Sequence, residues 1–277
     1  MTGEAIKLVE GKAVNMPLDF DGKRYEQAST HQKEWGSRLI ESLELAGDER
    51  VLDLGCGDGA LTAQMAKCVP RGQVIGVDAS PGMLNVARQY QAENLQFQLL
   101  DIENLSYDSE FDLVFSNATL HFLRDHSNLL RNIYRALRNG GVVRCNFGAD
   151  GNCVHFFQAV RETMDSDRFA SYFDGVEWPY YMPEVDEYRN LVSESHFRQF
   201  EVWGENADRY FPDATALTKW IDQPAIVAFL KSIAGSDKQV FRDSVVKKTI
   251  ALTQQPDGTC FETFRRVNLL AKKSNQS

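Results

Sequence analysis

The 277-residue chain lacks the features of secreted, membrane-spanning and metal-binding proteins. Its five cysteines are odd in number and contain no C-x-x-C pair, which argues against a disulfide framework and a structural zinc site. No apolar run approaches the roughly 18 residues of a transmembrane helix, and the first residues have no apolar signal-peptide core. We therefore expect a cytoplasmic protein with no resident metal.

Positive charge is also scarce, because 30 Lys and Arg face 39 Asp and Glu, giving a formal net charge of −9. No run of Lys and Arg exceeds two residues, as in Lys247-Lys248, Arg265-Arg266 and Lys272-Lys273. Nucleic-acid partners need a basic face, so we expect these pairs to be solvated surface. The expected partner is a small molecule, with neither nucleic acid nor membrane, and nothing in the sequence indicates an oligomeric state.

What the chain does have is a glycine-rich turn between a strand and a helix, in the segment 50–60. An apolar strand leads into Gly55, Gly57 and Gly59, and a helical pattern starts at Leu61. Glycine allows a tight turn and a close approach of the backbone to a ligand, while a helix N-terminus favours polar or anionic groups. The segment predicts a nucleotide-type site at the end of the first strand of an α/β sheet.

Two cofactors fit this turn. Gly55-x-Gly57-x-x-Ala60 matches the dinucleotide fingerprint. The same residues resemble the D-x-G-x-G-x-G motif of class I S-adenosylmethionine-dependent methyltransferases, with Asp53 as its acid. A carboxylate beneath a pyrophosphate would repel it, whereas a sulfonium and an ammonium tolerate it, so Asp53 favours S-adenosylmethionine.

Three later strands end in polar residues that strengthen this resemblance. The strand 73–78 ends in Asp78, 23 residues after Gly55, where a carboxylate accepts hydrogen bonds from ribose hydroxyls. The strands 97–101 and 111–117 end in Asp101 and Asn117. A helix over 125–138 and a fifth strand through Phe147 follow. Over residues 20–150 the series resembles class I methyltransferases, and among them the small-molecule group that includes trans-aconitate methyltransferase.

The resemblance implies contacts to S-adenosylmethionine. Asp78 would bind the ribose, Asp101 and the Ile102 backbone the adenine amine, and Asn117 the methionine end. Tyr25 and Gln32, from a Tyr-x-x-x-Ser-x-x-Gln pattern on one helical face, would lie near the cofactor carboxylate or sulfonium. The expected cofactor-binding residues are Tyr25, Gln32, Asp53, Gly55, Gly57, Asp78, Ala79, Met83, Asp101, Ile102 and Asn117.

The acceptor side is less defined. His121 is the one histidine in the core motif region, and it is a candidate general base or a substrate-binding residue. An aromatic cluster over 169–181 predicts either a pocket wall, with Trp178 and Tyr181 touching the acceptor, or a structural core. Arginine can grip a carboxylate with two parallel hydrogen bonds. The candidate arginines are Arg124, Arg144 and Arg168.

The alternation of strands and helices predicts an α/β protein with a doubly wound, seven-stranded Rossmann-like methyltransferase sheet and an added helical cap. We expect one helix over 20–45, a helix over 183–195, long strands over 197–211 and 259–272, and two helices over 213–254. Residues 1–149 would form the N-terminal helical segment and cofactor-binding core. Residues 150–277 would complete the sheet and carry inserted cap helices (150–195 and 212–258), as one structural unit with the core.

The resulting hypothesis is methyl transfer from S-adenosylmethionine to a small molecule. Proximity and orientation supply much of the rate of such a reaction, so a catalytic dyad is not required. A carboxylate acceptor is ionised at neutral pH and needs no base, which favours an organic acid. The alternatives are O-, N- or C-methylation of an apolar or aromatic metabolite, a cofactor-binding protein without catalysis, and a dinucleotide reductase.

Overall fold

The apolar segments predicted as strands form one seven-stranded sheet in the computed structural model, which describes residues 20–275. The strand order is β3-β2-β1-β4-β5-β9-β6, and β9 runs antiparallel to both of its neighbours. The strands are β1 (Arg50–Leu54), β2 (Gln73–Asp78), β3 (Leu95–Leu99), β4 (Phe111–Asn117), β5 (Leu137–Gly148), β6 (Gln199–Asn206) and β9 (Arg265–Lys272). The predicted sheet is confirmed, and its order reverses between β1 and β4, where ligand crevices form in such sheets.

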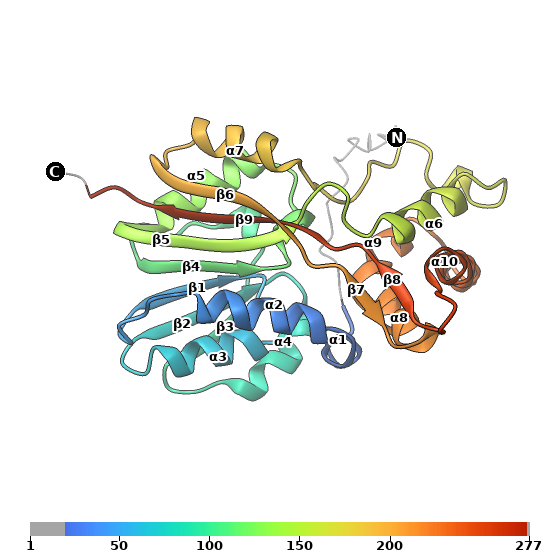
Figure 1. Ribbon diagram of the computed structural model, residues 1–277. Helices are drawn as coiled ribbons and strands as arrows, with labels where there is room; N and C mark the ends of the chain where they lie inside the picture. Colours follow the sequence, from blue (N-terminus) through green and yellow to red (C-terminus); the bar gives the residue numbers. More distant parts are fainter. Residues whose placement is uncertain (1–19, 276–277) are drawn as a thin grey trace, which may run out of the picture.

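Helices cover both faces of the sheet (Figure 1). One face carries α2 (Thr30–Glu41), α3 (Ala60–Cys68) and α4 (Pro81–Ala87), and the other carries α5 (His126–Ala136) and α7 (Val185–Glu194). The Ser80 hydroxyl accepts a hydrogen bond from the Met83 N–H and caps α4, with Pro81 at its first position. Short 3₁₀ turns are η1 (Arg88–Tyr90), η2 (Ile102–Asn104), η3 (Leu120–Phe122) and η4 (Ala170–Tyr172).

The single helix expected over 20–45 is wrong. The segment forms α1 (Gly22–Ala28) and α2, separated by Ser29, whose φ of −96° and ψ of 23° leave the helical region. The Ser29 N–H still closes the last turn of α1 onto the Tyr25 carbonyl. The break lets α1 pack against α4 while α2 lies against α3.

The two long strands expected near the C-terminus are each broken. The first divides into β6 and β7 (Arg209–Phe211), and the second divides into β8 (Cys260–Glu262) and β9. At the break, the Ala207 N–H donates to the Phe264 carbonyl (2.7 Å) and the Phe264 N–H to Asp208 (2.9 Å). Beyond it, β7 and β8 leave the main sheet and pair with each other as a separate two-stranded ribbon.

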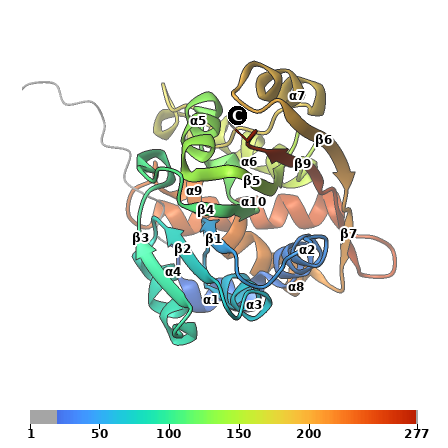
Figure 2. The same ribbon diagram turned by 90° about the vertical axis from the view of Figure 1, so that its left-hand side faces the viewer.

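This ribbon leads into a helical cap beyond one end of the sheet (Figures 1 and 2). The cap contains α6 (Val154–Met164), α8 (Ala214–Trp220), a π-helical turn (Ile221–Ala225), α9 (Val227–Leu230) and α10 (Asp237–Thr253). Two helices were expected over 213–254. The first is divided into α8, the π-helical turn and α9, because Pro224 lacks the N–H that a continuous α-helix needs. A second apolar core, with Phe156, Trp220, Phe229 and Phe241 fully or nearly buried, holds the cap together.

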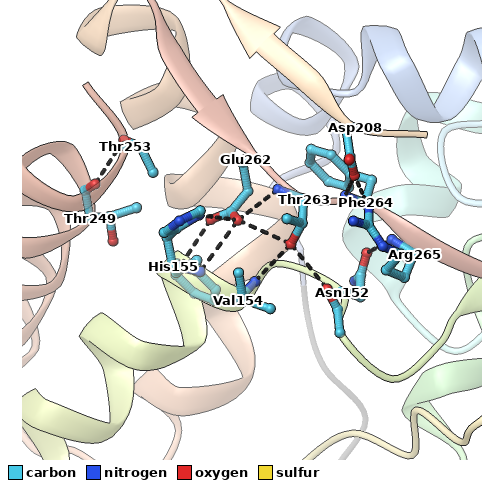
Figure 3. Close-up of polar contacts among 12 residues, drawn as sticks. Asn152, Val154, His155, Asp208, Thr249, Thr253, Glu262, Thr263, Phe264 and Arg265 are labelled. Carbon is cyan, nitrogen blue, oxygen red and sulfur yellow. Dashed lines mark hydrogen bonds and ion pairs between the residues drawn. The ribbon is translucent and has the colours of Figure 1, made fainter. Parts of the chain in front are cut away.

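A buried carboxylate joins the ribbon to the cap (Figure 3). Glu262, at the end of β8, is fully buried and accepts hydrogen bonds from the N–H groups of His155 (3.3 Å) and Phe156 (2.9 Å) in the first turn of α6. It also contacts the His155 ring (2.9 Å) and accepts the Thr263 N–H (2.8 Å). Glu262 therefore caps α6 from a different element.

Two further observations concern the whole chain. None of the helices within residues 20–275 is long and apolar enough to cross a lipid bilayer. The division near residue 149 into a core and a remainder stays a prediction, although α7, expected among the cap helices, lies on the sheet face against β6.

Candidate active site

A cavity of about 440 Å³ opens where the carboxyl ends of β1, β2 and β4 face the cap. The sheet side is lined by residues at or after these strand ends, and the cap closes the opposite side. Sheet-side residues include Gly55, Gly57, Asp78, Asp101 and Asn117, and cap residues include Phe156, Phe157, Tyr180, Ala228 and Lys231. This is the crevice at the reversal of strand order, the usual place for a ligand in this fold class.

The glycine turn is built as the sequence predicts. Gly55 and Gly57 have φ values of +70° and +56°, which side chains other than glycine's rarely permit. A Cβ at Gly55 would lie 2.1 Å from the side chain of Thr119. A Cβ at Gly57 would meet nothing within 4 Å, so a ligand in the cavity can approach the backbone there.

Asp78 is fixed against this turn. Its Oδ2 accepts the Gly57 N–H (2.9 Å) and its Oδ1 accepts the Ser80 N–H (2.8 Å). Burial raises the pKa of the carboxyl above its usual value, and these backbone hydrogen bonds act in the opposite direction. Each oxygen keeps further acceptor capacity, so the oriented group can receive the two hydroxyls of a ribose.

Three buried polar atoms gather at the other end of the turn. Ser29 Oγ, Gln32 Oε1 and Asn117 Oδ1 have no hydrogen-bond partner within residues 20–275, and all three residues line the cavity. The Asn117 Nδ2 donates to the Gln32 carbonyl (2.9 Å), which fixes the free oxygen. A buried polar atom without a partner costs about 1–3 kcal/mol, so a polar ligand group is the expected partner. The amino-acid end of S-adenosylmethionine carries such groups, and the residues present fit it.

Apolar residues line the side nearest β2 and β3. Met83 and Ile102 are 4% and 6% exposed and, with Ala79, line the cavity. Asp101 caps η2, its Oδ1 accepting the Glu103 N–H (3.0 Å), and it also lines the cavity. Asp101 is thus the N-cap of η2, and its expected contact with an adenine amine stays a prediction.

Asp53 does not line the cavity. Its side chain lies under α3, where Oδ2 accepts a hydrogen bond from Thr62 Oγ1 (2.7 Å). The residue is 3% exposed, and burial raises its pKa to about 7. Because side chains alternate along a strand, Asp53 faces the helix layer rather than the cavity.

His121 lines the cavity as a neutral ring. Burial first, then the charges of Arg266 and His126, lower its pKa to about 3. Its Nδ1 accepts the Gly148 N–H (3.4 Å), so the proton of the neutral ring is on Nε2. At neutral pH His121 is thus a hydrogen-bond donor with little basicity.

Trp178 and Tyr181 are not brought to the cavity. Trp178 packs against Phe157 and Phe229, with ring centroids 5.3 and 5.0 Å apart, and its neighbour Tyr181 bonds to Glu187 (3.0 Å). Tyr180, which lies between them in the sequence, lines the cavity instead and donates to the Ala225 carbonyl (2.9 Å). Trp178 and Tyr180 both contact the Phe157 and Phe229 rings, but only Tyr180 reaches the cavity.

One basic residue of the cavity wall, Arg266, was missed from the sequence. Arg266, expected on the surface, is 4% exposed and lines the cavity, and Lys273 is also buried at 6%. The prediction that Arg266 and Lys273 are solvated surface residues is wrong. Alternation with Val267 places Arg266 on the opposite face of the strand, but no local pattern in the sequence shows that this face is enclosed as well.

The three arginines predicted for the acceptor have other partners. Arg124 lines the cavity but pairs with Glu177. Arg144 is buried against Asn268 (3.1 Å) and over the Trp203 ring (4.7 Å). Arg168 pairs with Asp237 (2.7 Å) on the outside of the cap.

Comparison with known proteins gives the family. The Methyltransferase domain family matches residues 51–141. The trans-aconitate 2-methyltransferase of Deinococcus radiodurans is 31% identical over 231 residues, covering 81% of this chain and 86% of that protein. This chain is a class I S-adenosylmethionine-dependent methyltransferase. The methyltransferase is also 27% identical to the trans-aconitate 2-methyltransferase of Azoarcus sp., over 80% of this chain and 86% of that one.

Solved structures agree on the fold. A putative methyltransferase from Bacillus halodurans superposes with a TM-score of 0.59 at 17% identity, covering 86% of this chain and 98% of that chain. Phosphoethanolamine N-methyltransferase 2 of Haemonchus contortus, in complex with S-adenosyl-L-methionine, gives 0.58 at 21% identity, covering 92% and 57%. S-adenosylmethionine is the methyltransferase's cofactor. Within residues 20–275, no three His, Cys, Asp or Glu side chains gather to hold a metal ion.

Proposed function

We propose that the cavity holds S-adenosylmethionine along the strand ends, with its adenosine toward β2 and β3 and its amino-acid end toward β4. The support is the oriented Asp78 carboxylate for the ribose, Asp101 and the apolar Met83 and Ile102 for the adenine, and the unpartnered Gln32 and Asn117 oxygens for the ammonium. Tyr25, Ala79, Gly55 and Gly57 line the same space. Bound there, the cofactor supplies a methyl group activated by a positively charged sulfur.

We propose that the acceptor is a small organic acid, methylated on a carboxylate oxygen. The observation that carries this is the state of His121, the one histidine among the described lining residues. With its pKa lowered to about 3, it is a weak base at neutral pH. A phenol or an ammonium acceptor needs a base, whereas a carboxylate is already ionised. The trans-aconitate methyltransferase relatives point the same way.

In this reaction the residues orient and shield. The acceptor oxygen forms a bond to the methyl carbon as the carbon–sulfur bond breaks, and no proton moves. The Nε2–H of His121 can donate to the acceptor and hold it in line, while Phe156 and Tyr180 exclude water from the cap side. Placement of the two reactants is the main contribution of the protein.

Since all five cysteines are free thiols, we also propose that the enzyme works in the reducing cytoplasm.

The variant His121→Ala tests this account. We expect it to lower kcat by less than about tenfold, the cost of one lost hydrogen bond rather than of a general base. We also expect kcat in both proteins to be flat between pH 6 and 8, because His121 titrates near pH 3 and its protonated fraction there is negligible. A rate that falls tenfold per unit below pH 6.5 in the wild type, and loses that dependence in the variant, would show that His121 is the base.

A further inference from the structure

Arg266 is a buried cation on the cavity wall with an incomplete set of partners. Its Nη2 donates to Asn146 Oδ1, and its guanidinium lies 4.4 Å from the centre of the Trp35 ring. Its Nε is buried and has no hydrogen-bond partner within the described chain, where no carboxylate pairs with it. The adjacent Arg265 does pair with a carboxylate, that of Asp208. The charge of Glu205 acts on Arg266 without contacting it. A buried guanidinium with no anion in contact is unfavourable, and an anionic ligand relieves this.

The strand order places Arg266 beyond the cofactor's proposed position. The cofactor would lie over β3, β2, β1 and β4, and β9 is two strands past β4. Strands are about 4.8 Å apart, so the backbone of Arg266 is about 10 Å from β4. Because β9 is antiparallel, its first residues meet the carboxyl end of β5, and Arg266 pairs there with Gly148.

The surroundings of Arg266 are those of an acceptor pocket. Gly148 has no side chain to separate Arg266 from His121, and its N–H holds His121 in place. Both His121 and Arg266 line the cavity, and after burial the charge of Arg266 is the next largest cause of the lowered pKa of His121. Burial lowers the pKa of Arg266 itself to about 10, so it remains a cation at neutral pH. From the cap, Lys231 lines the same cavity.

We propose that Arg266 binds a carboxylate of the acceptor other than the one that is methylated, an inference that rests on the proposed organic-acid function. A guanidinium gripping the reacting carboxylate would occupy its lone pairs and weaken it as a nucleophile. Held at a second carboxylate, the same group fixes the acceptor's distance and direction relative to the methyl carbon. Arg266 is thus the residue that selects acids with at least two carboxylates.

The test compares Arg266→Gln with wild type on three ligands. Two are acceptors, namely the best substrate among fumarate, itaconate and trans-aconitate, and the same acid with every carboxylate except the methylated one converted to an amide. The third is S-adenosylhomocysteine, measured by calorimetry. We expect the variant to raise KM for the acid about 30-fold or more, as on truncating one partner of a buried charge pair. It should change KM for the amide and the affinity for S-adenosylhomocysteine by less than threefold.

Two further variants complete the design. Arg168→Gln, a surface arginine outside the cavity, should match wild type in all three measurements. Arg266→Lys keeps the charge without the two-pronged donor, and we expect KM between those of wild type and Arg266→Gln. It also provides the test if Arg266→Gln does not fold.

The outcomes separate this inference from the function it rests on. If wild type methylates none of the acids, the proposed function fails. If wild type methylates them but Arg266→Gln affects acid and amide equally, only the role of Arg266 fails. A weakened affinity for S-adenosylhomocysteine with an unchanged KM for the acid would place the cofactor's own carboxylate on Arg266 and overturn the proposal.

Discussion

Asp78 is the side chain that we propose binds the cofactor ribose, and it is hydrogen-bonded to the glycine turn. Two backbone N–H groups orient its carboxylate, and the residue lies on the cavity wall. Replacing Asp78 with Ala should remove both ribose contacts and the anchor of Gly57. We expect binding of S-adenosylhomocysteine to weaken by about 2 kcal/mol or more, the scale of hydrogen bonds to a charged group.

Calorimetric titration measures this effect, with the circular dichroism spectrum as the control for folding. Asp112→Ala is a matched variant, since that carboxylate lies at the start of β4 and pairs with Arg138 (3.0 Å), away from the cavity. It should bind like wild type. An unchanged affinity in folded Asp78→Ala would contradict the ribose assignment.

At the scale of single residues, the sequence predicts what a local motif determines. Gly55, Gly57, Asp78 and Asn117 each follow a strand of recognisable pattern, so their place at one sheet edge follows from the fold alone. Arg266 depends on which strand pairs with β5, and no spacing within the chain carries that information. Tyr180 was missed in favour of its neighbours because an aromatic cluster does not reveal which ring points inward.

Among the elements, the first turn of α6 depends on a residue more than 100 positions away. Glu262 accepts the N–H groups of His155 and Phe156, in addition to Thr263. Glu262→Ala would leave these buried or partly buried donors without a partner, and an unpaired buried donor costs about 1–3 kcal/mol. We expect the free energy of unfolding to fall by about 3 kcal/mol.

Urea unfolding monitored by fluorescence provides the measurement. Glu162→Ala is the control, because this residue lies on the same helix but is 48% exposed and pairs with Lys248 at the surface. It should cost less than about 1 kcal/mol. Equal losses in the two variants would mean that Glu262 is not what holds α6 to the ribbon.

The boundaries of elements were predicted where periodicity changes and missed where it continues. Alternation runs through Asp208 and through Thr263-Phe264, so each pair of strands looks like one. The breaks arise from tertiary contacts, since the Phe264 N–H bonds to Asp208 across them. Ser29 divides α1 from α2 for a similar reason, because α1 packs on α4 and α2 on α3. The five strands before the cap carry strong local signals and were all predicted.

For the molecule as a whole, we propose that cofactor binding and acceptor binding are carried out by different parts of the fold. The strand ends from β3 to β4 present a row of groups suited to one long cofactor. The broken strands β6–β7 and β8–β9 carry the cap beyond this end of the sheet (Figure 1). Arg266 lies at the start of β9, paired with Gly148 of β5. The proposed acceptor pocket is therefore made jointly by the last strand of the sheet and the cap helices.

The central claim is that this methyltransferase makes a methyl ester from a small organic acid. Mass spectrometry of reactions with methyl-labelled S-adenosylmethionine, run on a panel of organic acids, phenols and amines, tests it directly. The account predicts a labelled product only from the acids, and predicts that mild base hydrolyses it to return the acid and labelled methanol. A base-stable ether or N-methyl product, with no ester from any acid, would contradict the account.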